Sequence, residues 1–283
     1  MPNISRRLLP ITTKLTGKAP LCPWKAALSF LNPKTLGIHP PEISIEIAEK
    51  GDGIVRLLFG GKHSFWFPAS MPVNAELWSE YLVAFWDSPT NFHQYLVPGL
   101  SIGPEDIVVD CGACEGFFTR RAIENGAAKV IAVEPSQIMA KCLRLTFASE
   151  IKKGKVVIEE CALGDHPGTA NFSDTDIFGG HIDAGNGTPV KVSTLDQISA
   201  AHGAVTFVKM DLEGVEYQAL LGGKMLLSER QPKLAITTYH NPWDYTATEA
   251  FVSSMGYKRY APTGVTFRGT STPRPMMFHA VSN

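Results

Sequence analysis

The chain has 283 residues, of which 26 are Lys or Arg and 27 are Asp or Glu, so its net charge is −1 at neutral pH. Apolar residues make up 44% and charged residues 19%, which supplies a sizeable core and excludes a largely disordered chain. The balanced charge argues against a general nucleic-acid binder, and the lack of any run of 18 apolar residues argues against a membrane-spanning helix.

The N-terminal segment, residues 1–42, is rich in Pro, Thr and Lys and predicts a loosely ordered basic arm. Its Ser5–Leu9 run is similar to a twin-arginine export signal, but polar residues follow it instead of an apolar segment, which disfavours export. The cysteines have no framework spacing, which indicates reduced thiols in a cytoplasmic protein. They are Cys22, Cys111, Cys114, Cys142 and Cys161.

The elements before residue 100 predict a small β-containing extension. Short runs at Ile43–Ile47, Ile54–Phe59 and Ser64–Phe67, separated by glycine turns, favour an antiparallel meander. Apolar residues at helical spacing predict an amphipathic helix over residues 75–86, whose aromatic side chains suit packing, with a substrate surface as the alternative. We therefore divide the chain into an extension, residues 1–100, and a second domain, residues 101–283.

In the second domain, strands alternate with helices. Seven strands are predicted, at residues 106–111, 129–134, 155–161, 205–211, 233–239, 258–261 and 275–281. Helices are expected at residues 117–125, 136–149, 194–202, 217–229 and 243–255. This alternation is typical of an α/β fold with a doubly wound, mostly parallel sheet covered on both faces. Its ligands bind beyond the carboxyl ends of the strands.

The strongest chemical signal is a glycine turn after the first of these strands, within Asp110–Thr119 (DCGACEGFFT). Gly112 and Gly116 permit a ligand to approach the backbone and the following helix N-terminus. The G-x-x-x-G spacing differs from the G-x-G-x-x-G of dinucleotide sites, and Asp110 suits an ammonium or hydroxyl group better than a pyrophosphate. A tight turn without a ligand is the alternative.

Glu134 ends the next strand, 24 residues after Asp110, where an acidic residue of a βαβ unit accepts hydrogen bonds from ribose hydroxyls. With the glycine turn it predicts a nucleoside site, and its charge disfavours a 2′-phosphate. Cys111 and Cys114 form a C-x-x-C without the second pair that zinc would need. We interpret both cysteines as small residues of the turn, with a redox role as the alternative.

The run Lys209–Glu216 (KMDLEGVE) places acidic residues at the end of the fourth of these strands. Lys209 and Asp211 share a face of the strand, so we expect an ion-paired lysine rather than a free base. Asp211, Glu213 and Glu216 could hold a hard cation, or they could cap the helix and orient a substrate. We favour the second interpretation and predict no metal site, because no complete oxygen-ligand loop is visible.

His240 follows the fifth strand, within Tyr239–Asp244 (YHNPWD), and is expected to reach the same crevice. Histidine suits proton transfer near neutral pH, which makes His240 a candidate base. A structural histidine that bonds to a loop is an equal alternative, and Asp244 suits a helix N-cap.

Taken in order, these motifs resemble the FkbM-type family of S-adenosylmethionine-dependent methyltransferases over residues 106–280. The likeness rests on the glycine turn, Val133–Pro135, Ala162–Gly164, the K-x-D-x-E-G-x-E run and the Tyr-His segment from Tyr239. It implies a Rossmann-like class I methyltransferase fold. Cys114 departs from the class I pattern, because it stands where a glycine is common.

The resemblance also implies roles for single residues. Glu134 would bind the ribose hydroxyls, and Ala162 would lie near the adenine. His240 would be the first choice of base and Asp211 the second. The full set for S-adenosylmethionine is Asp110, Gly112, Ala113, Gly116, Phe117, Thr119, Glu134, Pro135, Ser136, Ala162, Leu163 and Asp211. The catalytic set is His240, Asp211, Glu213 and Lys209.

The implied activity is direct methyl transfer to an oxygen of a small metabolite, such as a sugar or a polyketide, with residues 1–100 covering the acceptor side. Nitrogen methylation and a cofactor-binding module without transferase activity are alternatives. An NAD-dependent oxidoreductase on the same topology is a third, which the missing dinucleotide fingerprint disfavours. We expect neither nucleic acid nor membrane as partner, and we leave a homodimer and a metal-assisted reaction open.

Overall fold

The computed structural model describes residues 41–88, 91–173, 181–182, 187–241, 243–264 and 274–282, together with residues 15 and 266. Almost all of the predicted basic arm, including Cys22, lies outside these residues, as does Pro242 of the Tyr-His segment. Among the helices of the described ranges, none has the length and apolar character needed to cross a membrane.

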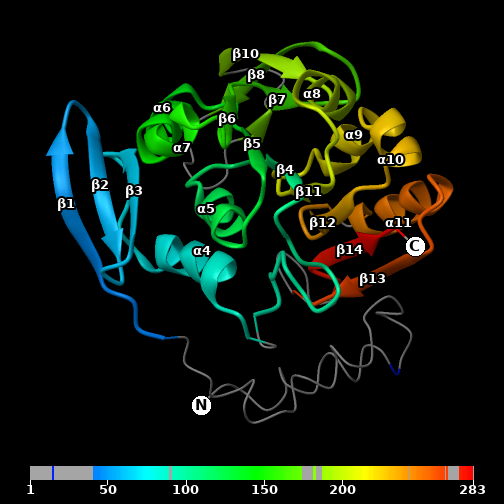
Figure 1. The fold of residues 1–283 in the computed structure, drawn as a ribbon, viewed down its shortest axis with the longest axis horizontal. Coiled ribbons are helices and arrows are strands. Elements are labelled where there is room, and N and C mark those ends of the chain that lie inside the picture. Colours follow the sequence, from blue (N-terminus) through cyan, green and yellow to red (C-terminus); the bar gives the residue numbers. More distant parts are fainter. Residues whose placement is uncertain are drawn as a thin grey trace.

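A seven-stranded sheet forms the centre of the molecule, in the order β13-β14-β12-β11-β4-β5-β6 (Figure 1). The strands from β6 to β12 pair in parallel, and β14 and β13 complete the sheet in antiparallel pairing. The predicted fold class is therefore confirmed. The strands are β4 (Ile107–Cys111), β5 (Lys129–Val133), β6 (Val156–Glu159), β11 (Phe207–Met210), β12 (Lys233–Thr237), β13 (Arg259–Thr263) and β14 (Met277–Val281).

The order of the strands places a ligand crevice between β4 and β11. From β4 the chain proceeds outward through β5 and β6, and it then returns to the other side of β4 to form β11 and β12. Such a reversal leaves an opening at the carboxyl ends of the two central strands. The glycine turn follows β4, and the Lys209–Glu216 run begins within β11 and continues beyond its end. Both predicted motifs therefore meet at this opening.

Helices cover both faces of the sheet, as predicted. On one face, Val108 lies in the same core as Phe118 of α5 (Phe117–Glu124) and Leu143 of α6 (Gln137–Thr146). On the other, the next strand residue, Val109, lies in a core with Leu220. That face is covered by α8 (Leu195–His202), α9 (Glu216–Leu221), α10 (Lys224–Glu229) and α11 (Asp244–Ser254). The short helix α7 (Ala148–Lys152) follows α6.

The helix predicted over residues 217–229 is wrong in one respect, because it is divided into α9 and α10. The break falls at Gly222, where a Cβ atom would come within 2.1 Å of the carbonyl oxygen of Gly164. This close backbone approach requires a glycine and interrupts the regular helix.

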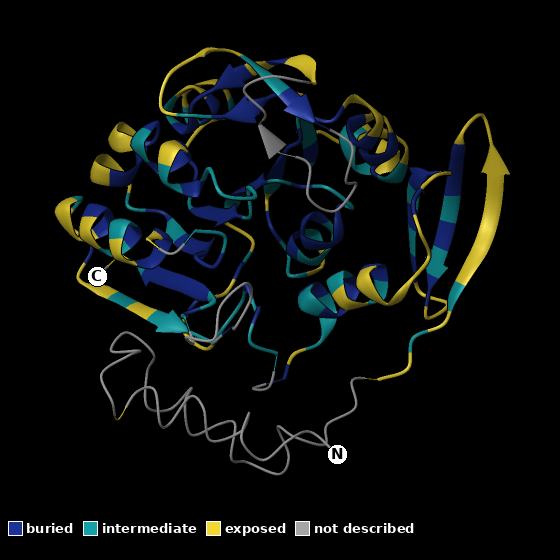
Figure 2. Ribbon diagram, turned by 180° about the vertical axis from the view of Figure 1, so that it is seen from behind, coloured by how far each residue is buried: buried dark blue, intermediate teal, exposed yellow. Residues whose placement is uncertain are grey.

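The extension forms the predicted meander of β1 (Ile45–Gly51), β2 (Ile54–Phe59) and β3 (His63–Pro68), followed by α4 (Ala75–Phe85). The meander lies at one side of the molecule against α6, and its outer strand β1 is largely exposed (Figures 1 and 2). Phe117 of α5 joins the extension to the sheet, since its ring meets those of Phe59, Phe65 and Tyr81 edge to face. Tyr81 of α4 therefore serves packing, as predicted.

A second sheet, of four strands in the order β7-β10-β8-β9, was not predicted. Its members are short, and two of the six residues of β8 and three of the six of β10 are exposed, so these strands give little apolar signal. Phe172, in β8, reaches the pocket described below. The strands are β7 (Ala162–Leu163), β8 (Gly168–Ser173), β9 (His181–Ile182) and β10 (Thr188–Ser193).

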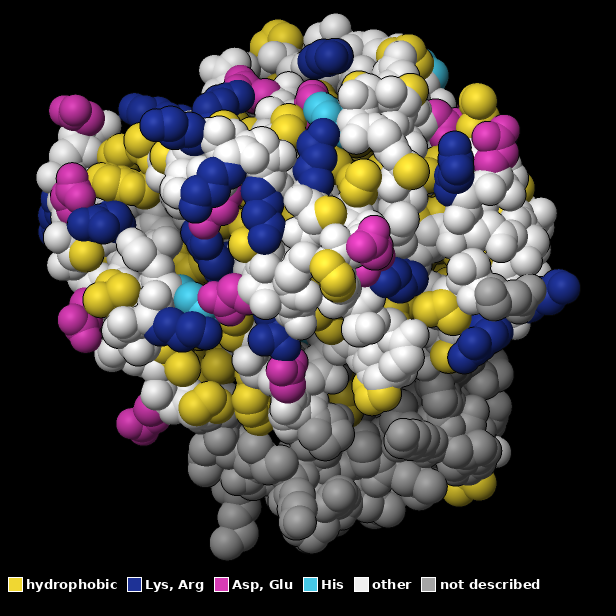
Figure 3. Space-filling model, viewed as in Figure 1, with side chains coloured by type: hydrophobic (Ala, Val, Ile, Leu, Met, Phe, Trp, Pro, Cys, Tyr) yellow, Lys and Arg dark blue, Asp and Glu magenta, His cyan; other side chains and the backbone are white. Residues whose placement is uncertain are grey.

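Surface charges of both signs intermingle on the face shown in Figure 3. Some are paired, as in Arg56–Glu49 at 3.1 Å and Arg144–Glu160 at 2.8 Å. Exposed pairs of this kind add little stability. This face therefore carries the balanced charge of the chain in mixed form rather than as a patch of one sign.

We predict that Phe117→Ala destabilises the whole fold, because it removes a ring that is 4% exposed and contacts four other rings. The expected loss is about 3–5 kcal/mol in the free energy of unfolding, measured by denaturant titration. Met225→Ala, at a side chain that is 62% exposed, is the control and should change it by less than about 0.5 kcal/mol. Equal effects of the two changes would contradict this role for Phe117.

Candidate functional site

A pocket of about 520 Å³ opens beyond the carboxyl ends of β4, β5 and β11, with α4 forming part of its wall. Its volume lies in the range typical of small-molecule sites. Of the predicted site residues, Asp110, Gly116, Thr119 and His240 do not line the pocket. Those that do are Gly112, Ala113, Phe117, Glu134, Pro135, Ser136, Ala162, Leu163, Lys209, Asp211 and Glu213.

Close packing against protein atoms explains both glycines of the turn. Gly112 has φ +78°, and a Cβ atom there would lie 2.0 Å from the carbonyl oxygen of Asp211. Gly116 has φ +79°, and its Cβ would lie 2.7 Å from the ring of Phe147. The turn is thus pressed against β11 and α6, which fixes the pocket wall that its backbone forms.

A buried ion pair supports this turn from below. Lys209 Nζ lies 3.1 Å from Asp110 Oδ1 and donates to the carbonyl oxygen of Gly112 at 2.6 Å. Asp110 Oδ2 accepts a hydrogen bond from Thr119 Oγ1 at 2.7 Å. Burial alone would lower the pKa of Lys209, but Asp110 and Asp211 raise it above its usual value. Lys209 is therefore the ion-paired cation that the sequence predicts, and not a free base.

Glu134 is oriented by the backbone on either side of it. Its Oε2 accepts from the amide of Cys114 at 2.9 Å, and its Oε1 accepts from the amide of Ser136 at 2.8 Å. The side chain is 5% exposed and lines the pocket at the end of β5. The carboxylate thus holds the glycine turn to the start of α6, which makes it structural as well as available to a ligand.

Their surroundings keep the two thiols of the C-x-x-C in the protonated form. Burial raises the pKa of Cys111, as does the neighbouring Asp110, and burial with Glu115 and Glu134 raises that of Cys114. Both are free cysteines, like the other two in the described part of the chain. A thiol with a raised pKa holds its proton and is a poor nucleophile or metal ligand.

Asp211 is held in the pocket by two residues that the sequence analysis missed, Tyr95 and His93. Its Oδ2 accepts from Tyr95 Oη at 2.6 Å and lies 3.4 Å from His93 Nε2. Its Oδ1 accepts from Thr237 at 3.3 Å. Burial would raise the pKa of Asp211, but His93, Lys209 and His240 lower it well below the usual value. Asp211 is therefore a fixed carboxylate in the pocket wall.

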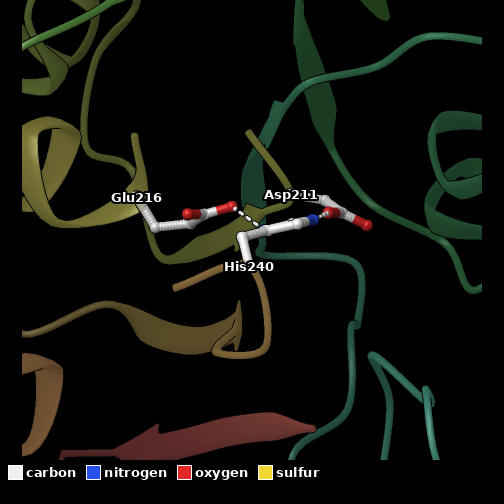
Figure 4. Close-up of side chains that lie close together, drawn as sticks. All are labelled: Asp211, Glu216 and His240. Atoms are coloured by element: carbon white, nitrogen blue, oxygen red, sulfur yellow. Dashed lines mark hydrogen bonds and ion pairs between the residues drawn. The ribbon is translucent and has the colours of Figure 1, made fainter. Parts of the chain in front are cut away.

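His240 lies between carboxylates on both sides of its ring (Figure 4). Its Nδ1 is 2.8 Å from Glu216 Oε1, and its Nε2 is 3.3 Å from Glu213 Oε2 and 3.7 Å from Asp211 Oδ1. Burial would lower its pKa, but Glu213, Glu216 and Asp211 raise it to about 10. At neutral pH, His240 is thus an imidazolium that neutralises its neighbours.

This arrangement bears on metal binding. Asp211, Glu216 and His240 offer potential ligand atoms within 4.8 Å of one another. However, the ring nitrogen nearest Glu216 differs from the one nearest Asp211, so each carboxylate is paired with its own edge of the ring (Figure 4). The geometry favours the interpretation in which these acidic residues orient the site, with the imidazolium as their cation.

The chain belongs to the FkbM methyltransferase domain family, whose model matches residues 110–259. The resemblance seen in the motifs is therefore confirmed. No curated protein matches the sequence.

Among solved structures, the chain is similar to a methyltransferase FkbM from Methylobacillus flagellatus KT, at 23% identity and a TM-score of 0.51. The match covers 68% of this chain and 50% of that one, so the chain spans half the length of that relative. A precorrin-6y C5,15-methyltransferase from Geobacter metallireducens GS-15 matches at 10% identity and a TM-score of 0.42, over 77% of this chain and 94% of that one. The first likeness supports the fold.

We predict that His240 stays doubly protonated at pH 8, while His279 is neutral, because burial lowers the pKa of His279 to about 4. Nitrogen chemical shifts of the two rings should differ accordingly in one sample. Since the pKa of His240 is raised from 6.5 to about 10, its stabilising effect is complete below pH 6.5 and is lost as the pH rises toward 10. The stability cost of His240→Gln should shrink over this interval, and a neutral ring at pH 7 would refute the assignment.

Proposed function

We propose that the chain is an S-adenosylmethionine-dependent methyltransferase that methylates a hydroxyl group of a small metabolite. The proposal rests on one observation. The glycine turn, Glu134 and Asp211 line the same pocket, in a chain whose residues 110–259 match the FkbM domain. No nicotinamide fingerprint is present in the turn, which speaks against hydride transfer.

The residues of the pocket fit the parts of this cofactor. Glu134 would bind the ribose hydroxyls, since a carboxylate is a strong acceptor and this one is fixed by two backbone amides. Met139, Ala162 and Leu163 give the lining an apolar portion suited to the adenine. The turn from Gly112 to Glu115 would hold the methionine part.

When bound, S-adenosylmethionine supplies an activated methyl group on a positively charged sulfur. The protein then has to align the acceptor oxygen and accept its proton. We propose that Asp211 aligns the acceptor by accepting a hydrogen bond from its hydroxyl, because it lines the pocket and is held there as a carboxylate by Tyr95. His240, the first choice from sequence, does not line the pocket and keeps its second proton up to about pH 10. It would act as a positioning residue for Asp211 and Glu213.

The acceptor would enter beside the extension. Glu80, Val83 and Ala84 of α4 line the pocket, as does Pro68 at the end of β3. These residues combine apolar surface with one carboxylate, which suits a metabolite that has both hydroxyl groups and apolar surface. We therefore propose that the extension selects the acceptor.

Calorimetric titration with S-adenosylmethionine, S-adenosylhomocysteine and NADH tests the cofactor. We expect both adenosyl ligands to bind and NADH to fail. Glu134→Gln should weaken both adenosyl ligands about ten- to a hundredfold, the effect of losing charged hydrogen bonds. Glu160→Gln, an exposed glutamate paired with Arg144 outside the pocket, is the matched control. Binding of NADH alone would overturn the proposal in favour of hydride transfer.

The contact with the acceptor is tested by methyl transfer from labelled cofactor to a panel of sugar and polyketide alcohols. With an acceptor from that panel, Asp211→Asn should slow single-turnover transfer about a hundredfold or more while cofactor affinity is kept. A cofactor-binding module would bind the ligands and methylate nothing. Little loss of rate in Asp211→Asn would remove the assignment of this residue.

A further inference from the structure

Carboxylates outnumber cations on the wall of the pocket. Among the described residues that line it, Lys209 is the only Lys or Arg. Its charge is already engaged by Asp110 and by the carbonyl of Gly112. The acidic lining residues are Glu76, Glu80, Glu115, Glu134, Asp211 and Glu213. The wall therefore presents an excess of negative charge to whatever fills the pocket.

Most of these carboxylates already have donors from the protein. Glu134 accepts from two amides, Asp211 from Tyr95 and Thr237, and Glu213 lies beside His240. Glu80 differs, because it makes no hydrogen bond or ion pair with another described residue, although it is only partly exposed. A half-buried carboxylate on a pocket wall without a donor is poorly stabilised as an anion.

Glu80 and Glu115 both line the pocket, and each feels the charge of the other or of the carboxylates around it. Glu80 belongs to α4, which packs on α5, and Glu115 directly precedes Gly116, the N-cap of α5. Burial and the charge of Glu115 raise the pKa of Glu80 to about 7, as do Asp211 and Glu213, whereas His93 lowers it. Burial raises the pKa of Glu115 to about 7, with Glu134 adding to it and Cys114 and Lys209 opposing.

We propose that Glu80 and Glu115 recognise the positive charge of the cofactor's sulfonium, so that the pocket distinguishes S-adenosylmethionine from its uncharged-sulfur product. The inference rests on the proposed function, and it concerns the glycine turn that contains Glu115 and that would hold the methionine part. A cation between two carboxylates in a partly desolvated site is attracted far more strongly than in water. Once the methyl group has left, this attraction is gone and release of the product is favoured.

Binding of S-adenosylmethionine should release protons from Glu80 and Glu115. Before binding, the two side chains together carry about one proton near pH 7. A cation beside them lowers both pKa values, so that proton leaves when S-adenosylmethionine binds. Affinity for S-adenosylmethionine therefore rises with pH through neutrality, whereas affinity for S-adenosylhomocysteine does not follow it.

Calorimetry in two buffers of different ionisation enthalpy measures the protons released. At pH 7 we expect up to about one proton per S-adenosylmethionine bound, and a rise in affinity of up to about tenfold from pH 6.5 to 7.5. Sinefungin, whose amine carries a charge in place of the sulfonium, should behave like S-adenosylmethionine. S-adenosylhomocysteine supplies the baseline, which removes the contribution of the α-amino group that all three ligands share.

Glu80→Gln should reduce the extra proton release to about half, because Glu115 still titrates. It should also reduce the preference for S-adenosylmethionine over S-adenosylhomocysteine several-fold. Glu46→Gln, at an exposed residue of β1 outside the pocket, is the matched control and should leave both unchanged. Binding of S-adenosylhomocysteine by each variant shows that it is folded. Equal proton release with both ligands, or an unchanged Glu80→Gln, overturns this inference and leaves the proposed function intact. Binding of neither ligand by the wild-type protein overturns both.

Discussion

The site depends on a single buried cation. Lys209 on β11 lies opposite Asp110 on β4 in the sheet register, and the pair is nearly inaccessible to solvent. Removing two charges from water is costly unless further hydrogen bonds complete them, and here the carbonyl of Gly112 and the hydroxyl of Thr119 do so. The ion pair thereby connects the two central strands, the glycine turn and the first turn of α5. Because the turn is tied in this way, it can keep residues such as Cys114, at φ 39°, in a strained backbone conformation.

A second cation, the His240 imidazolium, does the same for the acidic residues after β11. Each of the two cations is paired with a carboxylate that supports the pocket. Lys209 is paired with Asp110, and His240 is paired with Glu216. These cations therefore compensate the carboxylates that support the pocket, and they leave carboxylates on the pocket surface uncompensated. The remaining carboxylates, above all Glu80, face a cavity without a compensating protein cation. A site built in this way favours a positively charged occupant, which supports the sulfonium cofactor that we propose.

The sequence predicted those features that depend on local pattern. Buried strands, their helices and the motifs at the strand ends follow from hydrophobic periodicity and from turn residues, so the seven-stranded sheet and the positions of Glu134 and Asp211 could be derived. Tyr95 could not, because it meets Asp211 across 116 residues from a loop without any periodic signal. The same holds for the polar strands β8 and β10. The sequence also predicted the positions of the two glycines in the turn. It could not predict the atoms that require them, which are the carbonyl oxygen of Asp211 and the ring of Phe147.

The helix α4 shows how one pattern can carry two functions. Leu77 and Tyr81 repeat at a spacing of four and bury one face, where Tyr81 joins the ring cluster around Phe117 and hydrogen-bonds to His63. Glu76 and Glu80 repeat at the same spacing one residue earlier, and this adjacent face lines the pocket. From sequence alone, such glutamates indicate a solvated helix face. Because the buried face fixes the rotation of the helix, packing of the extension also fixes where Glu80 points. Substitutions in the meander or at Tyr81 that turn α4 would therefore change the charge presented to the cofactor, even though they lie outside the pocket.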